Sequence, residues 1–171
     1  GVVMKKIIFF PIMIIFLMCC SNPSKSELDD CFAIYLLKND TLDYHDVIDI
    51  GMQNVELENS PLVSSENIAY YDLETENFYL KHLPELSSLN ERENFFQHAG
   101  DVPFVFVINT RRYFIGSHVG MACSHIFAGP RLDYFLDSTV GMSVIRITFS
   151  EEDKYLKEAP KYQAILNKFS K

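Results

Sequence analysis

Several features that are common in proteins are scarce in this sequence. Tryptophan is absent, and the 171 residues include only 7 glycines and 7 prolines. Collagen-like and low-complexity disordered chains need far more glycine and proline, so these classes are excluded. The 14 phenylalanines, 9 tyrosines and 48% hydrophobic residues indicate instead a packed core, and the length fits one domain.

Basic residues are also few. The chain has 15 Lys and Arg against 23 Asp and Glu, which gives a formal net charge of -8 at pH 7. A chain of this charge repels a polyanion on average, and we find no basic stripe in the domain beyond the pair Arg111 and Arg112. We therefore expect no nucleic-acid partner.

The chain has one long apolar run, which lies near its N-terminal end. Lys5 and Lys6 precede the run from Ile7 to Cys20, and the polar segment SNPSKSELDD follows it. Charged, apolar and polar parts in this order are typical of an export leader. The run is shorter than the about 20 residues that a membrane-spanning helix needs. It also contains Pro11, which disfavours a continuous helix.

The last residues of this run, LMCC, resemble the lipobox of bacterial lipoproteins, in which a leucine stands three residues before the modified cysteine. Leu17 stands three residues before Cys20, whereas Phe16 would take that place if Cys19 were modified. Cys19 departs from the Gly, Ala or Ser that usually precedes the modified cysteine. The resemblance implies that Cys20 carries a thioether-linked diacylglycerol and a further acyl chain such as palmitate. Several acyl chains would anchor the protein stably to a membrane.

This interpretation divides the chain and places it in the cell envelope. No Asp follows Cys20 directly, so the inner-membrane retention signal of enteric bacteria is missing. In a Gram-negative host we therefore expect the outer membrane. The expected parts are a cleaved signal peptide at 1–19, a lipidated tether at 20–30 and a single extracytoplasmic domain at 31–171.

Cysteine and histidine supply candidate chemistry in the domain. Cys31 and Cys123 either form a disulfide, which an exported protein allows, or remain small buried residues. His118, Cys123 and His125 offer three ligands in one loop, but their spacing matches no structural zinc pattern. We expect no metal and no other cofactor. The same loop offers Cys123 as a nucleophile with His118 or His125 as its base.

Two further segments carry side chains that suit a site. The run YYDLETE offers Asp72, Glu74 and Glu76 as paired carboxylates, although an exposed turn is the commoner origin of such a run. Exposed Tyr and Arg are favoured at interfaces, so the segment RRYF predicts a contact surface, the alternative being that its aromatics cover the core. The residues of this expected interface are Arg111, Arg112, Tyr113 and Phe114.

The apolar patterns predict an α+β domain, with one mixed or mostly antiparallel sheet and helices packed mainly on one face. The strongest unit is a hairpin with a strand at 104–108, a turn at Asn109 and Thr110, and a return strand through Ile115. Pro160 predicts a break in the terminal helix. The other expected elements are strands at 31–38, 54–58, 76–83 and 142–149 and helices at 65–71, 88–99 and 150–169.

The order of these segments resembles that of small extracytoplasmic domains in uncharacterised bacterial lipoproteins. The segments are FAIYLLKN, VELENSPLVSSENIAYYDLETENFYL and VPFVFVINTRRYFIGS. They are also distantly similar to the periplasmic head domain of the SecDF export factors. The membrane helices through which SecDF works are not in this sequence, so no export role carries over. The resemblance implies a noncatalytic α+β module.

These observations lead to two hypotheses about function. The first is a lipid-anchored cell-envelope lipoprotein whose domain acts as a binding or interaction module for an envelope protein, with no catalytic residue assigned. The alternative is a cell-envelope hydrolase that uses Cys123 with His118 or His125.

Overall fold

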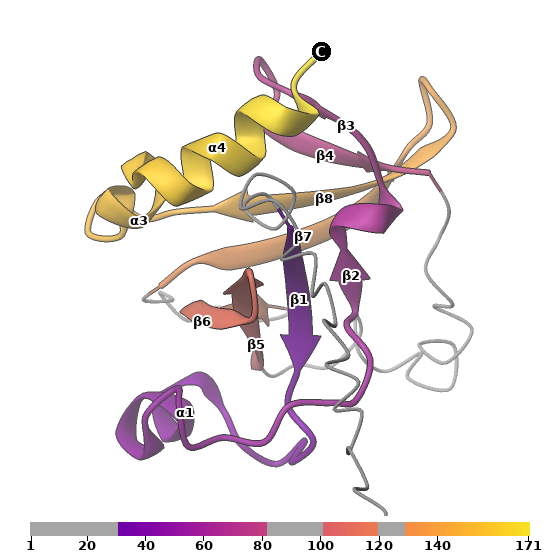
Figure 1. Ribbon diagram of the computed structural model, residues 1–171. Coiled ribbons are helices and arrows are strands. Elements are labelled where there is room, and N and C mark those ends of the chain that lie inside the picture. The colour runs from indigo at the N-terminus through magenta and orange to yellow at the C-terminus, as the bar shows by residue number, and fades with distance from the viewer. Residues whose placement is uncertain (1–30, 82–100, 120–128) are drawn as a thin grey trace, which may run out of the picture.

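The computed structural model describes residues 31–81, 101–119 and 129–171 (Figure 1). Within these residues eight strands form one sheet in the order β2-β1-β5-β6-β7-β8-β4-β3, which curves until it is nearly barrel-shaped. Neighbouring strands are antiparallel except for β6 and β7, which are parallel. The predicted α+β class with a mixed, mostly antiparallel sheet is therefore confirmed. The leader with Cys20, the loop residues Cys123 and His125 and the expected helix at 88–99 lie outside the described residues.

The strands are β1 (Phe32–Leu36), β2 (Val63–Ser64), β3 (Ile68–Asp72), β4 (Asn77–Leu80), β5 (Asp101–Ile108), β6 (Arg111–Val119), β7 (Arg131–Asp137) and β8 (Met142–Thr148). The helices are α1 (Tyr44–Ile50), the 3-10 helix η1 (Ser65–Asn67), α3 (Lys154–Glu158) and α4 (Pro160–Phe169).

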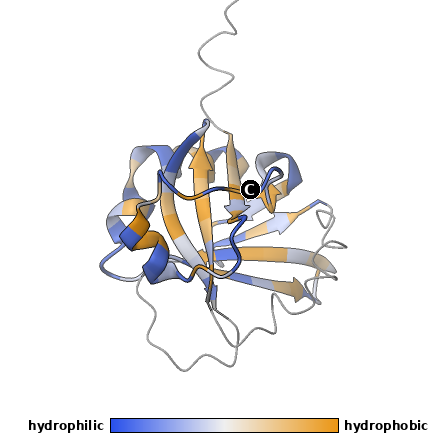
Figure 2. Ribbon diagram, turned by 90° about the horizontal axis from the view of Figure 1, so that it is seen from below, coloured by the Kyte–Doolittle hydropathy of each residue, from blue (hydrophilic) through white to orange (hydrophobic). Residues whose placement is uncertain are grey.

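Different helices cover the two faces of the sheet. On one face α4 contributes Tyr162, Ile165 and Leu166 to the main core, and Leu156 of α3 packs against the same core. On the other face α1 places Val47 in a smaller core formed with β5 and β6. Figure 2 shows that the strands are hydrophobic along much of their length, whereas the turns are hydrophilic. We call the side of β7, β8, β4 and β3 that points away from the main core the outer face.

A stack of aromatic rings connects α4 to three adjacent strands. Phe106 of β5 stacks between Phe32 of β1 and Phe114 of β6, with ring centroids 5.1 and 4.8 Å away. Tyr162 of α4 packs across Phe106 and Phe114 at 5.6 and 6.2 Å. Burial raises the pKa of Tyr162 well above its usual value, so its hydroxyl stays protonated. Each such pair contributes about 0.5–1.5 kcal/mol beyond the burial of its area.

The predicted hairpin is confirmed, with Asn109 and Thr110 forming a two-residue turn between β5 and β6. Both residues have positive φ, 48° and 67°, as a type I′ turn requires. The backbone N–H of Cys31 donates to the Asn109 side chain at 3.2 Å, and the Asn109 N–H donates to the Cys31 carbonyl at 3.0 Å. These two hydrogen bonds fix the first described residue of the domain to the turn.

Other expectations had mixed outcomes. The strands at 31–38 and 142–149 are confirmed as β1 and β8, and the break at Pro160 is confirmed because this residue begins α4. The strand at 76–83 exists as β4. Its alternation of Phe78 and Leu80 with Tyr79 and Lys81 predicts a half-exposed strand. This prediction is wrong, because all four residues of β4 are buried.

Two predicted elements are wrong, and three further observed elements were not predicted. The helix at 65–71 is replaced by η1 and β3, because pairing of Tyr70 and Tyr71 with β4 extends this segment. The strand at 54–58 is a loop with one isolated bridge, between Leu57 and Leu37. The unpredicted elements are α1, β2 and β7.

We predict that Thr110→Gly stabilises the protein. A β-branched residue is strained at positive φ, whereas glycine adopts this conformation freely and is the residue that a type I′ turn prefers. Relief of this strain, less the added entropy of glycine in the unfolded chain, should raise the free energy of unfolding by roughly 0.5–1 kcal/mol. Denaturant unfolding measures this change.

Thr139, in the turn between β7 and β8, provides the matched control. Its φ is not among the positive values of the described residues, and its side chain and backbone N–H both donate to Asp137. Thr139→Gly should therefore destabilise the protein. A loss of stability in Thr110→Gly of the same size would contradict the strain argument.

Candidate functional site at the β6–β7 junction

The two halves of the sheet meet where β6 runs parallel to β7. Among the described residues, the register between these strands consists of the pair Ser117 and Arg131. The Ser117 N–H donates to the Pro130 carbonyl at 2.9 Å. Gly116, one residue earlier, has no room for a side chain, because a Cβ there would overlap the Phe104 ring and the Pro130 carbonyl. The close approach of the strands therefore requires glycine.

His118 adds a side-chain hydrogen bond to this short junction. It is only 7% exposed, and its Nδ1 lies 2.8 Å from the Leu132 carbonyl oxygen on β7. A carbonyl oxygen only accepts, so Nδ1 carries the hydrogen and donates it. Burial lowers the pKa of His118 below its ordinary value of 6.5, which favours the neutral ring at pH 7. The imidazole thus adds a side-chain hydrogen bond between β6 and β7, next to the single register pair that joins their backbones in the described residues.

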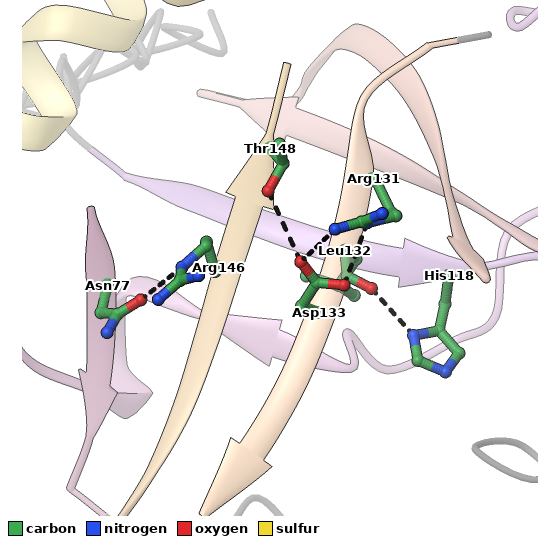
Figure 3. A network of polar contacts seen from close by, with 7 residues as sticks. All are labelled: Asn77, His118, Arg131, Leu132, Asp133, Arg146 and Thr148. Carbon is green, nitrogen blue, oxygen red and sulfur yellow. Dashed lines mark hydrogen bonds and ion pairs between the residues drawn. The ribbon is translucent and has the colours of Figure 1, made fainter. Parts of the chain in front are cut away.

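Charged and polar side chains continue from this junction across the outer face (Figure 3). Arg131 of β7 makes a two-point contact with Asp133, at 3.1 and 3.2 Å, and Thr148 of β8 lies 3.5 Å from the same carboxylate. Next to them, Nε of Arg146 donates to the buried Asn77 side chain on β4 at 2.8 Å. This network therefore connects three neighbouring strands.

A second row of side chains lies beside this network on the same face. Phe135 is opposite Val144, Val144 is opposite Tyr79, and Tyr79 is opposite Tyr70, so the row crosses four strands. The rings of Tyr79 and Tyr70 stack with centroids 4.5 Å apart, and the Tyr79 hydroxyl donates to Asp137 at 3.0 Å. We call these two rows together the outer ladder.

The cations beside the outer ladder cover some of its ring faces. The guanidinium of Arg146 lies 5.4 Å from the centroid of the Phe135 ring, and Nζ of Lys171 lies 4.1 Å from that of Tyr70. Hydrogen bonds from Thr139, with a further one from Tyr79, lower the pKa of the Asp137 carboxyl, which keeps it ionised at neutral pH. The ladder thus offers fixed charges and aromatic edges, which suit recognition of a polar partner.

The structure describes one residue of the predicted loop site. His118 is buried at the β6–β7 junction, whereas Cys123 and His125 lie outside the described residues. The pairing of Cys123 with a histidine therefore stays a prediction. The same holds for the disulfide, since Cys31 is exposed and is the one cysteine in the described ranges.

The four residues of the expected hairpin interface have different environments. Arg111 is exposed. The guanidinium of Arg112 donates to the carbonyls of Met52 and Val55, which secures the loop after α1 to β6. Tyr113 is half-buried against the main core, and Phe114 is buried within it. For Phe114 the alternative interpretation, that it covers the core, is therefore correct.

Asp72, Glu74 and Glu76, which carry the three carboxylates of the YYDLETE run, lie at the turn between β3 and β4. Asp72 accepts a hydrogen bond from the backbone N–H of Glu74 at 2.8 Å, which lowers the pKa of this carboxyl. Glu76 has a positive φ of 57° and pairs with Lys157 of α3 at 2.5 Å. These contacts support the turn interpretation over a pair of catalytic acids.

In the described ranges 31–81, 101–119 and 129–171, no group of three or more His, Cys, Asp and Glu side chains is placed to hold a metal ion. No helix in this part of the chain is long and apolar enough to span a membrane. No family model, curated protein or solved structure matches the chain.

Sequence reasoning missed the residues of the outer ladder, because β7 was not predicted. A usable signal existed: Leu132 and Tyr134 point to the main core, while Arg131 and Asp133 alternate with them. This is the period of two that a strand with one polar face shows.

We predict that His118→Asn removes a pH dependence of stability while keeping the hydrogen bond. The fold favours the neutral ring, so between the lowered pKa of the folded protein and 6.5 the unfolded chain binds more protons. The contribution of His118 is thus complete above pH 6.5 and is lost as pH falls through the lowered pKa. The Asn amide places a donor near Nδ1 but does not titrate. Chemical denaturation from pH 8 to pH 5, covering roughly the ordinary histidine range, measures the effect.

His118→Leu is the matched control, because it removes the titration and the hydrogen bond together. It should flatten the same part of the pH profile but be less stable than His118→Asn by about 1 kcal/mol at pH 8. If His118→Asn lost stability below pH 6.5 as steeply as the wild type, the assignment to this ring would be wrong.

Proposed function

We propose that this chain is a lipid-anchored cell-envelope protein whose domain binds a partner through the outer ladder. The anchor is supported by the leader that ends at Cys20, with Leu17 three residues before it. The binding role is supported by the outer ladder, a fixed array of charged and aromatic side chains that crosses four strands on the side away from α4.

The junction between tether and domain fits this proposal. Cys31 is held to the β5–β6 turn by two hydrogen bonds, so a pull from the anchor would act on a backbone paired within the sheet. Ten residues separate Cys20 from Cys31. A fully extended chain of this length reaches about 40 Å, which gives the domain room to meet an envelope partner near the membrane.

The outer ladder supports binding through rigidity. Asn77 and Tyr79 are buried, and each hydrogen-bonds to a charged group, Arg146 and Asp137 respectively. The half-exposed groups that they hold in place, Arg146 and Asp137, therefore lose little conformational entropy when a partner binds, which favours affinity. The hydrolase alternative depends on Cys123, which lies outside the described residues, so no contact in the described residues supports it.

The anchor is tested by metabolic labelling with an alkyne fatty acid. The wild type should be labelled and Cys20→Ser should not, because the thioether forms on that sulfur. Cys19→Ser is the matched control and should keep its label. Labelled Cys20→Ser together with unlabelled Cys19→Ser would move the anchor by one residue, and an unlabelled wild type would refute it.

The binding surface is tested by photo-crosslinking in cells. A photoreactive residue at Thr148, exposed on the outer face, should give a discrete adduct that Arg131→Glu weakens at least tenfold, since reversing one interfacial charge costs about 1.4 kcal/mol or more. The same probe at Ile48, exposed on α1, is the control and should give none.

A probe at Arg111 separates the outer ladder from the hairpin interface. Arg111 is the better position there, because replacing Arg112 would also release the loop at Met52 and Val55. An adduct at Arg111 without one at Thr148 would favour the hairpin. Equal adducts at all three positions would contradict a specific surface.

A further inference from the structure

The charge of the chain is unevenly distributed, and α4 holds an exception to its acidic balance. Residues 159–171 include Lys161, Lys168 and Lys171 and no acidic residue, although the whole chain carries a net charge of -8. All three lysines are exposed. The exposed positions between them hold Ala164 and Asn167.

Lys161, Ala164, Asn167 and Lys168 lie on the side of α4 opposite to its core contacts, whereas Lys171 follows the helix and places its Nζ over the Tyr70 ring of the outer ladder. Tyr162, Ile165 and Leu166 are buried in the main core. Their spacing of three and four residues puts them on one side of the helix, and the exposed lysines lie away from that side. The helix is thus amphipathic and fixed by its apolar side, as Figure 1 shows by its position over the sheet. We call Lys161, Ala164, Asn167 and Lys168 the basic face.

The basic face ends beside the place where the tether joins the domain. Phe32 follows Cys31 directly, and its ring meets that of Phe169 with centroids 6.1 Å apart. The Lys171 N–H donates to the Tyr71 carbonyl at 3.3 Å, which holds the end of the chain against β3. The residues through which an anchor would connect to the domain therefore lie next to the C-terminal turn of α4.

We infer that the basic face docks on the anionic phospholipid headgroups of the membrane that carries the anchor. This inference rests on the proposed lipid anchor, because the anchor brings the membrane within reach of α4. Lysines near an anionic surface are attracted to it, and the attraction extends only about one Debye length of 8–10 Å at physiological ionic strength. Acidic residues that lie farther than a Debye length from the basic face therefore do not cancel the attraction once this face is at the surface.

Docking of this kind would set the orientation of the domain. The small core under α1 lies on the opposite side of the sheet from α4, so α1 would point away from the lipid. The domain would rest on its anchor side instead of moving freely at the end of the tether.

A single introduced tryptophan tests the inference, since the chain has none of its own. Asn167→Trp places the probe between the lysines, and Ile48→Trp places a control on α1, where the native side chain is 52% exposed. The full acylated chain is reconstituted into vesicles of phosphatidylcholine alone or with about 30% phosphatidylglycerol, a content that gives a negative surface potential.

The expected result is a blue shift of the tryptophan emission of Asn167→Trp, with quenching by brominated lipid, in the anionic vesicles only. The emission of Ile48→Trp should be the same in both vesicles. Replacing Lys161 and Lys168 by glutamate should reduce the equilibrium constant for docking by on the order of thirtyfold or more, at about 1 kcal/mol for each lysine, and high salt should also reduce it. Circular dichroism and thermal unfolding of this double variant should stay close to those of the wild type, because both side chains are exposed.

The outcomes separate this inference from the proposed anchor. If the chain floats with both kinds of vesicle but the emission of Asn167→Trp is equal in them, the anchor holds and docking is refuted. Docking is also refuted if the double glutamate variant, tested with Asn167→Trp, keeps the blue shift. If the wild type floats with neither kind of vesicle, both the anchor and the docking are wrong.

Discussion

The continuity of the sheet depends on one close contact between parallel strands. On either side of it lie antiparallel pairs with long registers, but β6 and β7 meet at Ser117 and Arg131 among the described residues. Gly116 makes this approach feasible, because any side chain there would overlap both the Phe104 ring and the Pro130 backbone. Phe104 in turn is fully buried in the main core. A constraint at one glycine therefore connects the packing of β5 to the closure of the curved sheet.

The outer ladder and the His118 hydrogen bond both follow from this junction. Among the described residues the register of β6 with β7 consists of the Ser117–Arg131 pair, and the His118 ring supplies the donor for the next carbonyl of β7, that of Leu132. Beyond the junction, alternate residues of β7 lie on the outer face, so Asp133 stands opposite Arg146 of β8. Arg146 in turn donates to Asn77 of β4. Most of the charge in this network is exposed or half-exposed, so its contribution to stability is small and its fixed geometry matters more.

Sequence reasoning predicted the elements whose local signals agree with their tertiary pairing. The β5–β6 hairpin and β8 have strand patterns next to a defined turn, β1 is a nearly continuous apolar run, and Pro160 marks the break between α3 and α4. The segment 65–71 misled because Ser64 and Ser65 resemble a helix cap, and the cap is real, with Asn67 accepting from the Ser64 N–H at 2.8 Å. It begins only one turn of 3-10 helix, since pairing with β4 then extends the chain. The sequence also contains signals for α1 that our prediction did not use. Asp43 and Asp46 form a capping box at its N-terminus, and Gly51 ends the helix.

The candidate sites were less predictable because they combine residues that are distant in the sequence. Asn77 and Arg146 are 69 positions apart, and only the order of β4, β8 and β7 in the sheet makes them neighbours. Arg112 is a second example. Its position in the RRYF segment predicts an exposed contact residue, but its guanidinium donates to two carbonyls of the loop after α1. Net charge misleads in the same way. A balance of -8 argues against polyanions as an average, yet α4 collects basic residues on one exposed side. Since charges act within about one Debye length, what a partner meets is the charge of one face and not that of the chain.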